Sequence, residues 1–194
     1  MSPYQKPLMK EFIWHGRGGR GVWTASILLA KALVKLYQVQ SFPTFGPERE
    51  GAPLEAFNRI SNKKINLHCE IYNPDFVIVL DPTLLTEKRS QEIYSTLKSD
   101  GVVIINSPEK IEKPNTYTVD ASKIAEKYLD RREMVNIAML GALKKVLDEK
   151  YQFPKIPWKS LKNAINEEFL QKNRPGIAEK NIAAMKEVYK MLEV

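Results

Sequence analysis

The sequence of 194 residues contains one cysteine, Cys69, and only two histidines, His15 and His68. A single thiol cannot form an internal disulfide, and it cannot hold an iron–sulfur cluster, which needs about four ligands. A structural zinc site is disfavoured for the same reason. We therefore expect no metal centre in this chain, and we interpret Cys69 as a buried or half-buried small apolar residue.

Long apolar segments are also missing. No run approaches the roughly 20 uncharged apolar residues that cross a bilayer. Residues 1–10 contain two prolines and no apolar signal core, so they predict a short, poorly ordered leader. We expect a cytoplasmic protein that has no membrane partner.

Acidic residues are fewer than basic ones, 23 against 30, which gives a formal net charge of +7. A basic chain can bind nucleic acid, an anionic cofactor or an acidic protein. Here the lysines and arginines are scattered, without a dense run or interleaved aromatic residues. A lysine-rich soluble surface explains most of the excess, and a nucleic-acid-binding module stays as a weaker alternative.

Over the first 120 residues, short apolar segments alternate with segments in which apolar residues recur with the period of a helix. We expect strands at residues 12–15, 37–42, 54–60, 76–80, 102–105 and 116–119, and helices at 22–36 and 85–97. Residues 54–60 alternate apolar with polar side chains, which predicts a half-buried strand. Strands alternating with helices favour an α/β fold, a mostly parallel sheet with helices on both faces.

The character of the chain changes after residue 120. Residues 121–194 are mainly helical by periodicity, with helices expected at 121–129, 134–147, 158–170 and 177–192. Residues 151–157 contain two prolines and are the best linker, but they are few. Hydrophobic residues make up 43% of the chain, enough for one core. We expect a single domain over residues 1–194.

A glycine-rich turn follows the first expected strand. It consists of Gly16, Arg17, Gly18, Gly19, Arg20 and Gly21. The glycines match G-x-G-x-x-G, placed between a strand and a helix as in dinucleotide-binding folds. Backbone N–H groups at a helix start favour an anion, and the two arginines add positive charge.

A nicotinamide or flavin site would need an acidic residue about 20 positions further on, to hold the ribose. Residues 37–42 contain no carboxylate. A stand-alone dinucleotide-binding oxidoreductase is therefore only an alternative function. The spacing leaves two possibilities open: an anion or phosphate bound at the turn, or a turn that is structural or contacts another subunit.

Two segments together resemble one family. The turn is similar to the GRGGQGV motif of the gamma subunit of pyruvate and other 2-oxoacid:ferredoxin oxidoreductases. Residues 42–53, FPTFGPEREGAP, resemble that family's FPSFGPERRGAP motif. Asn58, Asn136 and residues 73–75 and 140–142 also match, so the resemblance covers about residues 11–147. The sequence differs at Arg20, where glutamine is common, and at Glu50, where a second arginine is common.

The resemblance implies one subunit of a larger enzyme. The complex decarboxylates a 2-oxoacid, pyruvate by default, on thiamine diphosphate with Mg. It passes electrons through iron–sulfur clusters to ferredoxin and makes an acyl-coenzyme A. These cofactors belong to alpha, beta and delta-type subunits or domains, and the gamma chain helps to enclose the active site and the coenzyme A site. This chain alone is expected to bind no cofactor and to be inactive.

The resemblance also implies that the loop after the second strand takes part in the interface or ligand site together with the turn. Its candidate residues are Phe45, Gly46, Pro47, Glu48 and Arg49. Since this loop follows the next strand of a parallel sheet, we expect it to meet the turn at the same sheet edge. From the residues alone, Glu48 and Arg49 could equally form a surface ion pair.

Other polar candidates are weaker. We interpret His15 as a structural histidine rather than a catalytic one. Asp81 ends the clearest core strand, where open α/β sheets bind ligands, or it caps the following turn. Trp14 and Trp23 are expected in the core or in subunit contacts. No Ser-His-Asp or Cys-His arrangement is present, so no catalytic residue is assigned to this chain.

Overall fold

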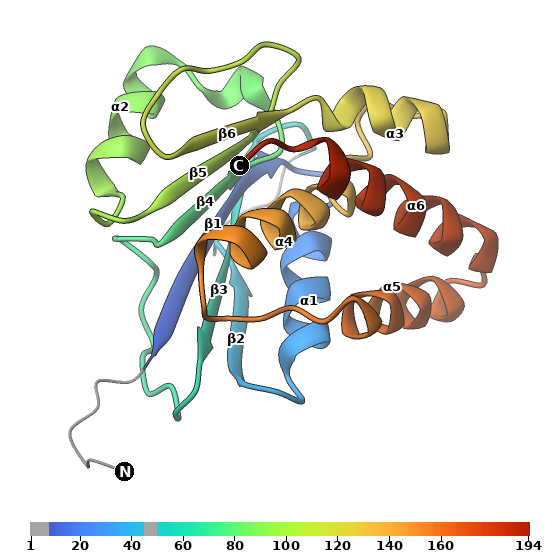
Figure 1. Cartoon of the computed structure of the whole chain (residues 1–194), viewed down its shortest axis with the longest axis horizontal. Coiled ribbons are helices and arrows are strands. Elements are labelled where there is room, and N and C mark those ends of the chain that lie inside the picture. Colours follow the sequence, from blue (N-terminus) through green and yellow to red (C-terminus); the bar gives the residue numbers. More distant parts are fainter. Residues whose placement is uncertain (1–7, 45–49) are drawn as a thin grey trace.

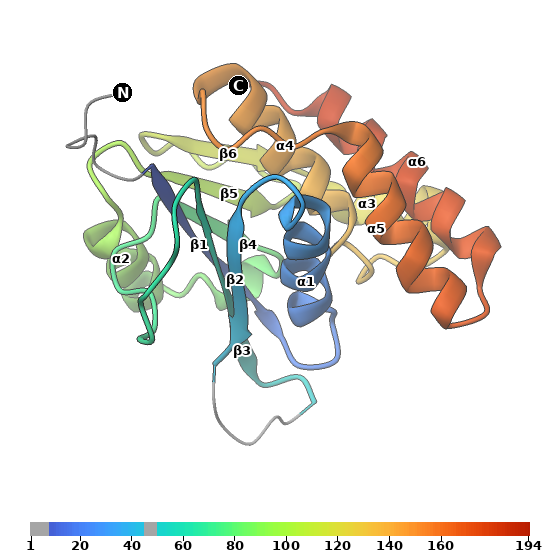
Figure 2. The same ribbon diagram turned by 90° about the horizontal axis from the view of Figure 1, so that it is seen from below.

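The computed structural model describes residues 8–44 and 50–194, and over these residues the chain forms a six-stranded sheet (Figures 1 and 2). The strands are β1 (Met9–Arg17), β2 (Gln38–Pro43), β3 (Pro53–Ser61), β4 (Phe76–Val79), β5 (Val102–Asn106) and β6 (Thr116–Val119). Their order is β2-β3-β1-β4-β5-β6. The pairs β1–β4, β4–β5 and β5–β6 are parallel, whereas β3 is antiparallel to β1 and β2. The predicted α/β class with a mostly parallel sheet is confirmed.

Helices cover both faces of the sheet, but unequally (Figure 1). They are α1 (Val22–Leu33), the short 3₁₀ helix η1 (Pro82–Leu84), α2 (Glu87–Thr96), α3 (Ala121–Leu129), α4 (Ala138–Lys150), α5 (Trp158–Gln171) and α6 (Pro175–Met191). Side chains alternate along β4: Phe76 and Ile78 join the large core on the α1 side, whereas Val77 and Val79 pack with Ile93 of α2. A strand covered on both faces must be apolar throughout, as β4 and β5 are.

Helices α5 and α6 of the C-terminal region form the outer layer on the α1 side. Helix α5 packs against α1, and α6 packs against α3 and α4 (Figures 1 and 2). The proposed linker, residues 151–157, packs into this arrangement: the Tyr151 ring lies 4.8 Å from that of Phe76, and Phe153 lies 5.1 Å from Tyr37. The expected helical region after residue 120 is therefore confirmed, and its core is continuous with that of the sheet.

The prediction of a half-buried strand at residues 54–60 was wrong. Residues 56–61 of β3 are all buried, although they include Asn58 and Arg59. Helix α1 covers one face of β3, and the segment after β3 folds back over the other. The Arg59 guanidinium, 1% exposed, donates to the backbone oxygens of Cys69 and Glu70 at 2.9 and 3.0 Å. The polar side chains are buried because they have partners there.

The same returning segment corrects the prediction for Cys69, which is exposed. Its backbone oxygen faces Arg59, and Ile71 supplies the buried side chain of the segment. The helix predicted at 22–36 was also too long. Helix α1 ends at Leu33, and Leu36 is 50% exposed because the chain already turns into β2.

Strand β1 begins at Met9, so the last two residues of the predicted leader belong to the sheet, and residues 1–7 lie outside the described part. Among the described residues, no helix is both long and apolar enough to span a bilayer.

Candidate functional site

The sheet has a switch point between β1 and β4. These neighbouring parallel strands are followed by α1 on one face and by α2 on the other (Figure 2). Open α/β sheets bind ligands in the crevice that such a divergence leaves at the carboxyl ends of the strands. The glycine-rich turn leaves the carboxyl end of β1, and Asp81 follows β4, so both candidates lie at this edge.

The turn needs its glycines for geometric reasons. Gly21 caps the start of α1 with φ +74°, a left-handed conformation that disfavours a side chain. A Cβ at Gly21 would also meet the Asn136 side chain, whose Cγ would lie 2.9 Å away. Gly16 is buried against the Val22 side chain. The motif is therefore required for the strand-to-helix turn itself, whether or not a ligand binds there.

The expected meeting of the turn with the following loop is confirmed for the described part of that loop. The Gly18 N–H donates to Ala52 O at 2.8 Å, and the Gly51 N–H donates to Gly18 O at 3.1 Å. Gly19 is exposed beside the Glu50 side chain. The two segments meet because β1 pairs with β3 antiparallel, which brings Arg17 opposite Pro53. Phe45, Gly46, Pro47, Glu48 and Arg49 lie outside the described residues.

The Arg17 guanidinium ties three segments together. Its Nε donates to Asp81 Oδ2 at 2.8 Å, Nη1 to Gly51 O at 3.0 Å, and Nη2 to Thr83 Oγ1 at 2.8 Å. These contacts use every nitrogen of the group, so in this arrangement Arg17 holds the end of β4 and the β2–β3 loop against β1.

Asp81 caps the turn that follows β4, which is one of the two roles predicted for it. Its Oδ1 accepts from the Thr83 N–H at 3.0 Å and so caps η1. It also lines a cavity at the carboxyl edge. Burial alone would raise the pKa of the Asp81 carboxyl, but hydrogen bonds from Thr83 and Arg17 hold that pKa below its usual value. Asp81 is therefore ionised at neutral pH and balances Arg17.

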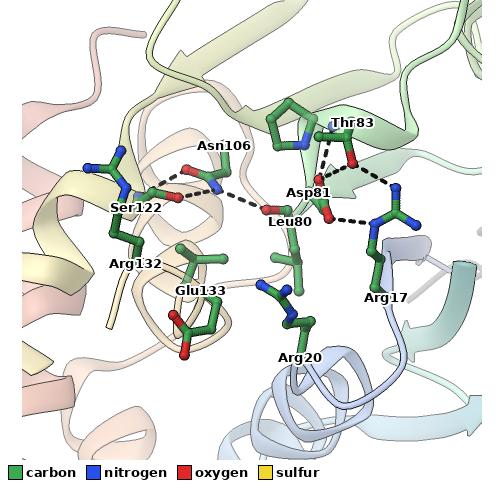
Figure 3. Close-up of a pocket in the computed structure, with 11 residues that line it drawn as sticks. Arg17, Arg20, Leu80, Asp81, Thr83, Asn106, Ser122, Arg132 and Glu133 are labelled. Carbon is green, nitrogen blue, oxygen red and sulfur yellow. Dashed lines mark hydrogen bonds and ion pairs between the residues drawn. The ribbon is translucent and has the colours of Figure 1, made fainter. Parts of the chain in front are cut away.

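A cavity of about 460 Å³ opens beside Asp81 on the α1 side of the sheet, and we call it the first cavity (Figure 3). Its lining comes from the glycine-rich turn, the ends of β4 and β5, the start of α3 and the α3–α4 connection. The lining residues are Arg17, Arg20, Leu80, Asp81, Pro82, Thr83, Asn106, Ser122, Arg132, Glu133 and Val135. Its size is within the range of small-ligand pockets, roughly 300–1,000 Å³.

The charged groups of the first cavity differ in how far they are paired. Arg17 and Asp81 neutralise each other, and Arg132 donates to Glu126 Oε2 at 2.7 Å. Arg20 and Glu133 are exposed, and neither the Arg20 guanidinium nor the Glu133 carboxylate makes a hydrogen bond or ion pair with any described residue. Figure 3 shows Arg20 between Arg17 on one side and Glu133 on the other. Arg20 is therefore the cation of this site that is available to an anion.

The start of α1 adds to this positive character. No side chain caps it, and its first turn contains no acidic residue. Uncapped N–H groups at a helix start carry partial positive charge. Asn136, 4% exposed, packs on Gly21 at this point, and its Oδ1 has no hydrogen-bond partner among the described residues.

Several cavity residues were not candidates from the sequence. Asn106 forms the cavity floor, where its Nδ2 donates to Leu80 O and to Ser122 Oγ at 2.9 and 3.0 Å. Its place at the carboxyl end of a buried strand, close to where Asp81 follows β4, was a usable signal. Arg132 and Glu133 follow a helix with no motif around them, and only the packing of α3 and α4 brings them here.

His15 and Trp14 point to opposite faces of β1. Trp14 is fully buried in the core, as expected, and its Nε1 donates to Asn58 Oδ1 at 2.8 Å. Trp23 packs at the edge of the same core. His15 is buried on the α2 side, with its Nδ1 3.2 Å from Glu55 Oε1. Within residues 8–44 and 50–194, no three His, Cys, Asp or Glu side chains cluster as metal ligands.

Comparisons with known proteins point to one family over nearly the whole chain. Residues 11–191 match the family model described as pyruvate ferredoxin/flavodoxin oxidoreductase. The chain is 42% identical to pyruvate synthase subunit PorC of Methanocaldococcus jannaschii, over 93% of this chain and 96% of that protein. It is 38% identical to the pyruvate/ketoisovalerate oxidoreductases common subunit gamma of Pyrococcus furiosus, over 96% and 98%. The crystal structure of pyruvate oxidoreductase subunit PORC from Thermotoga maritima superposes with a TM-score of 0.76 at 31% identity, over 95% and 97%.

Proposed function

Because this chain belongs to the pyruvate ferredoxin/flavodoxin oxidoreductase family, we propose that it is the gamma subunit of a 2-oxoacid:ferredoxin oxidoreductase. The complex converts pyruvate or a related 2-oxoacid to an acyl-coenzyme A and reduces ferredoxin. The observation that carries this proposal is end-to-end similarity to a pyruvate synthase subunit, over 93% of this chain and 96% of that protein.

The proposed division of work within the complex rests on the residues of this chain for the iron–sulfur clusters and on the family resemblance for thiamine diphosphate and Mg. One cysteine cannot supply the roughly four thiolates of an iron–sulfur cluster, so the residues present do not fit that group. Thiamine diphosphate, Mg and the clusters are held by the alpha, beta and delta-type partners. The gamma chain contributes surface and the first cavity, and alone it is inactive.

The choice of 2-oxoacid is made outside this chain. The relative from Pyrococcus furiosus is described as common to pyruvate and ketoisovalerate oxidoreductases. A subunit shared between two such enzymes cannot be the part that distinguishes their substrates. Pyruvate is the default substrate, and the partner subunits set the specificity.

The first cavity is proposed as part of the coenzyme A site. Coenzyme A is polyanionic at its nucleotide end, and this cavity is lined by the unpaired guanidinium of Arg20, which directly precedes the uncapped start of α1 in the chain. A phosphate at Arg20 gains charge-assisted hydrogen bonds worth about 1.5–3 kcal/mol each. Arg17 is not free for this contact in the present arrangement, and it supports the wall of the cavity instead.

A stand-alone nicotinamide enzyme receives no support. Strand β2, where the ribose-binding carboxylate would stand, consists of Gln38, Val39, Gln40, Ser41, Phe42 and Pro43. We expect no stoichiometric NAD or NADP complex in a calorimetric titration of the chain.

Steady-state kinetics of the reconstituted complex tests the coenzyme A assignment. Arg20→Ala should raise the KM for coenzyme A about ten- to hundredfold and leave the KM for pyruvate unchanged, because about 1.4 kcal/mol corresponds to tenfold. Arg174→Ala, an exposed arginine at the start of α6 and away from the cavity, is the matched control and should change neither. If Arg20→Ala lowers the yield of complex while the coenzyme A KM stays the same, the turn is a subunit contact and not a ligand site.

A further inference from the structure

A second cavity lies at the same sheet edge on the opposite face, between β1, β3 and the start of α2. Its volume is about 460 Å³, a size that suits a small ligand. Arg17 and Thr83 line both this cavity and the first one, so their hydrogen bond is part of the wall between them. The walls are mostly apolar, and their apolar part comes from Leu54, Val79, Leu84, Leu85 and Ile93.

His15 is a buried polar residue of this cavity, with 6% of the residue exposed. Its Nδ1 accepts a hydrogen bond from Arg89 Nη2 at 3.4 Å, because a guanidinium can only donate. The Glu55 carboxylate lies 3.2 Å from the same nitrogen, but it accepts from Arg89. Burial, and then the positive charge of Arg89, lower the pKa of His15 to about 3, so the imidazole is neutral at physiological pH. A neutral ring has one proton, and it is therefore on Nε2.

The Nε2–H group of His15 is a donor without a partner. No hydrogen bond of the described residues involves this nitrogen. It is also not among their fully enclosed atoms that lack a partner, so it keeps access to the cavity. Buried polar groups are normally hydrogen-bonded. A free donor in a mostly apolar cavity therefore calls for one acceptor atom from a ligand.

The charged groups at this cavity favour an uncharged ligand, because they are already paired. Arg89 contacts Glu55 closely and also donates to Glu92 Oε2 at 3.2 Å, while Arg17 is held by Asp81. A charged ligand would have to break one of these pairs and lose its hydration among apolar walls. A neutral carbonyl oxygen requires neither, and it accepts a hydrogen bond from an N–H group.

We propose that this second cavity is a binding site for a small, uncharged, mainly apolar molecule whose carbonyl oxygen accepts one hydrogen bond from His15 Nε2. A smaller cavity of about 290 Å³ shares His15, Arg89 and Ile93 with it and continues toward Ile13 and Tyr72. The site therefore has room for a molecule longer than one ring. It is independent of the coenzyme A assignment, because it lies on the other face of the sheet.

Nuclear magnetic resonance of the full chain tests both the position of the proton and the binding. The chain has only two histidines, so ¹⁵N-histidine labelling gives two imidazoles, with exposed His68 as an internal control. At neutral pH the ¹⁵N shifts of His15 should show a protonated Nε2 and an unprotonated Nδ1. Acetophenone should then shift the Nε2 resonance of His15 and leave those of His68 in place. An unprotonated Nε2, no shift at His15, or a shift at His68 as large as at His15 would overturn the proposal.

Acetophenone and α-methylstyrene are the matched probes for the hydrogen bond, since they share a ring and a shape but differ in a carbonyl oxygen against a CH₂ group. α-Methylstyrene is the more apolar of the two, so the ratio of the two affinities is compared between the unmodified chain and His15→Phe. The variant should prefer acetophenone about three- to tenfold less than the unmodified chain does, the change expected from one net hydrogen bond.

The same ratio in both proteins would contradict the proposal, because apolar contact alone would then account for binding. If His15→Phe does not fold, the resonance measurement on the unmodified chain decides the matter. None of these outcomes bears on the coenzyme A kinetics of Arg20→Ala.

Discussion

The charged side chains near the two ends of strand β1 differ in how completely they are paired. At the amino end, Asp75 is 4% exposed and accepts from Lys10 Nζ at 2.8 Å and from Lys98 Nζ at 2.6 Å. Lys98 also reaches Glu11, and Glu11 accepts from Arg59 Nε at 2.9 Å. Every member of this cluster has an opposite charge as a partner, so the network is closed.

At the carboxyl end, some charged side chains have no partner among the described residues. Arg17, Asp81 and Thr83 satisfy one another, but Arg20 and Glu133 are left without partners among the described residues. The two ends also differ in burial, since Asp75 and Arg59 are buried at the amino end, whereas Arg20 and Glu133 are exposed at the carboxyl end. The difference shows that the amino-end charges stabilise the fold, whereas the carboxyl-end charges that stay unpaired are available to a ligand or to another subunit. The following substitutions test this contrast, beginning with the largest expected effect.

Arg59→Ala should destabilise the chain by about 3–5 kcal/mol, because it leaves the partly buried Glu11 with Lys98 as its remaining cation and removes the buried guanidinium that holds the backbone oxygens of Cys69 and Glu70. Urea unfolding followed by circular dichroism measures the change. A loss below 1 kcal/mol would show that the amino-end network is not structural and that the contrast between the two ends is wrong.

Gly21→Ala should cost about 2–4 kcal/mol, since it adds the left-handed penalty of roughly 1–2 kcal/mol to a clash with Asn136. Gly176→Ala is the matched control, because it lies in α6 with open space around it. That control should stabilise by up to about 1 kcal/mol. Equal effects at the two glycines would mean that the turn at the carboxyl end tolerates a side chain.

His15 should make stability depend on pH. In the unfolded chain it takes up a proton below pH 6.5, whereas the folded chain keeps it neutral down to about pH 3. The unfolded state therefore binds more protons in this window, and stability falls as the pH falls, by up to about 1.4 kcal/mol per pH unit. Above pH 6.5 the contribution is fully present. His15→Gln should flatten this part of the pH profile, and exposed His68→Gln should not.

Arg17→Ala should cost about 1 kcal/mol, since its pair with Asp81 is partly exposed to solvent. Arg20→Ala should stay within about 0.5 kcal/mol, because no described residue depends on its guanidinium. Thermal unfolding of the two variants side by side measures the difference. If Arg20→Ala proved the more destabilising, Arg20 would belong to the structural network, and its assignment to an anion would lose its basis.

Much of this arrangement was accessible from sequence. The apolar runs in β4 and β5 indicate strands covered on both faces, and the glycine-rich turn indicates the start of α1. The burial of β3 was predicted wrongly because its alternation of apolar and polar residues cannot reveal that Arg59 finds a partner in Glu11 and carbonyl acceptors on a distant segment. Cys69 was misplaced for the same reason, since the segment that carries it has no periodicity.

The candidate site was predicted only in part. The sequence pointed to Arg17 and Arg20 as equivalent cations, because both flank the same glycines. The structure distinguishes them, since the side chain of Arg17 follows β1 toward Asp81 and Thr83, while Arg20 extends from the turn into the first cavity. Arg132 and Glu133, more than 100 residues further along the chain, reach this cavity only through the packing of α3 and α4.

The sequence by itself determined the family, the fold class, the strand-to-helix turn and the absence of enough cysteines to hold an iron–sulfur cluster, because each of these depends on local periodicity, on glycine at fixed positions or on residue counts. Tertiary structure alone decided which charges are paired, that the antiparallel β3 brings the β2–β3 loop onto the turn, and that Arg17 lines a cavity on each of its two sides. Pairing and enclosure depend on contacts between segments far apart in the chain, and no local pattern encodes those contacts.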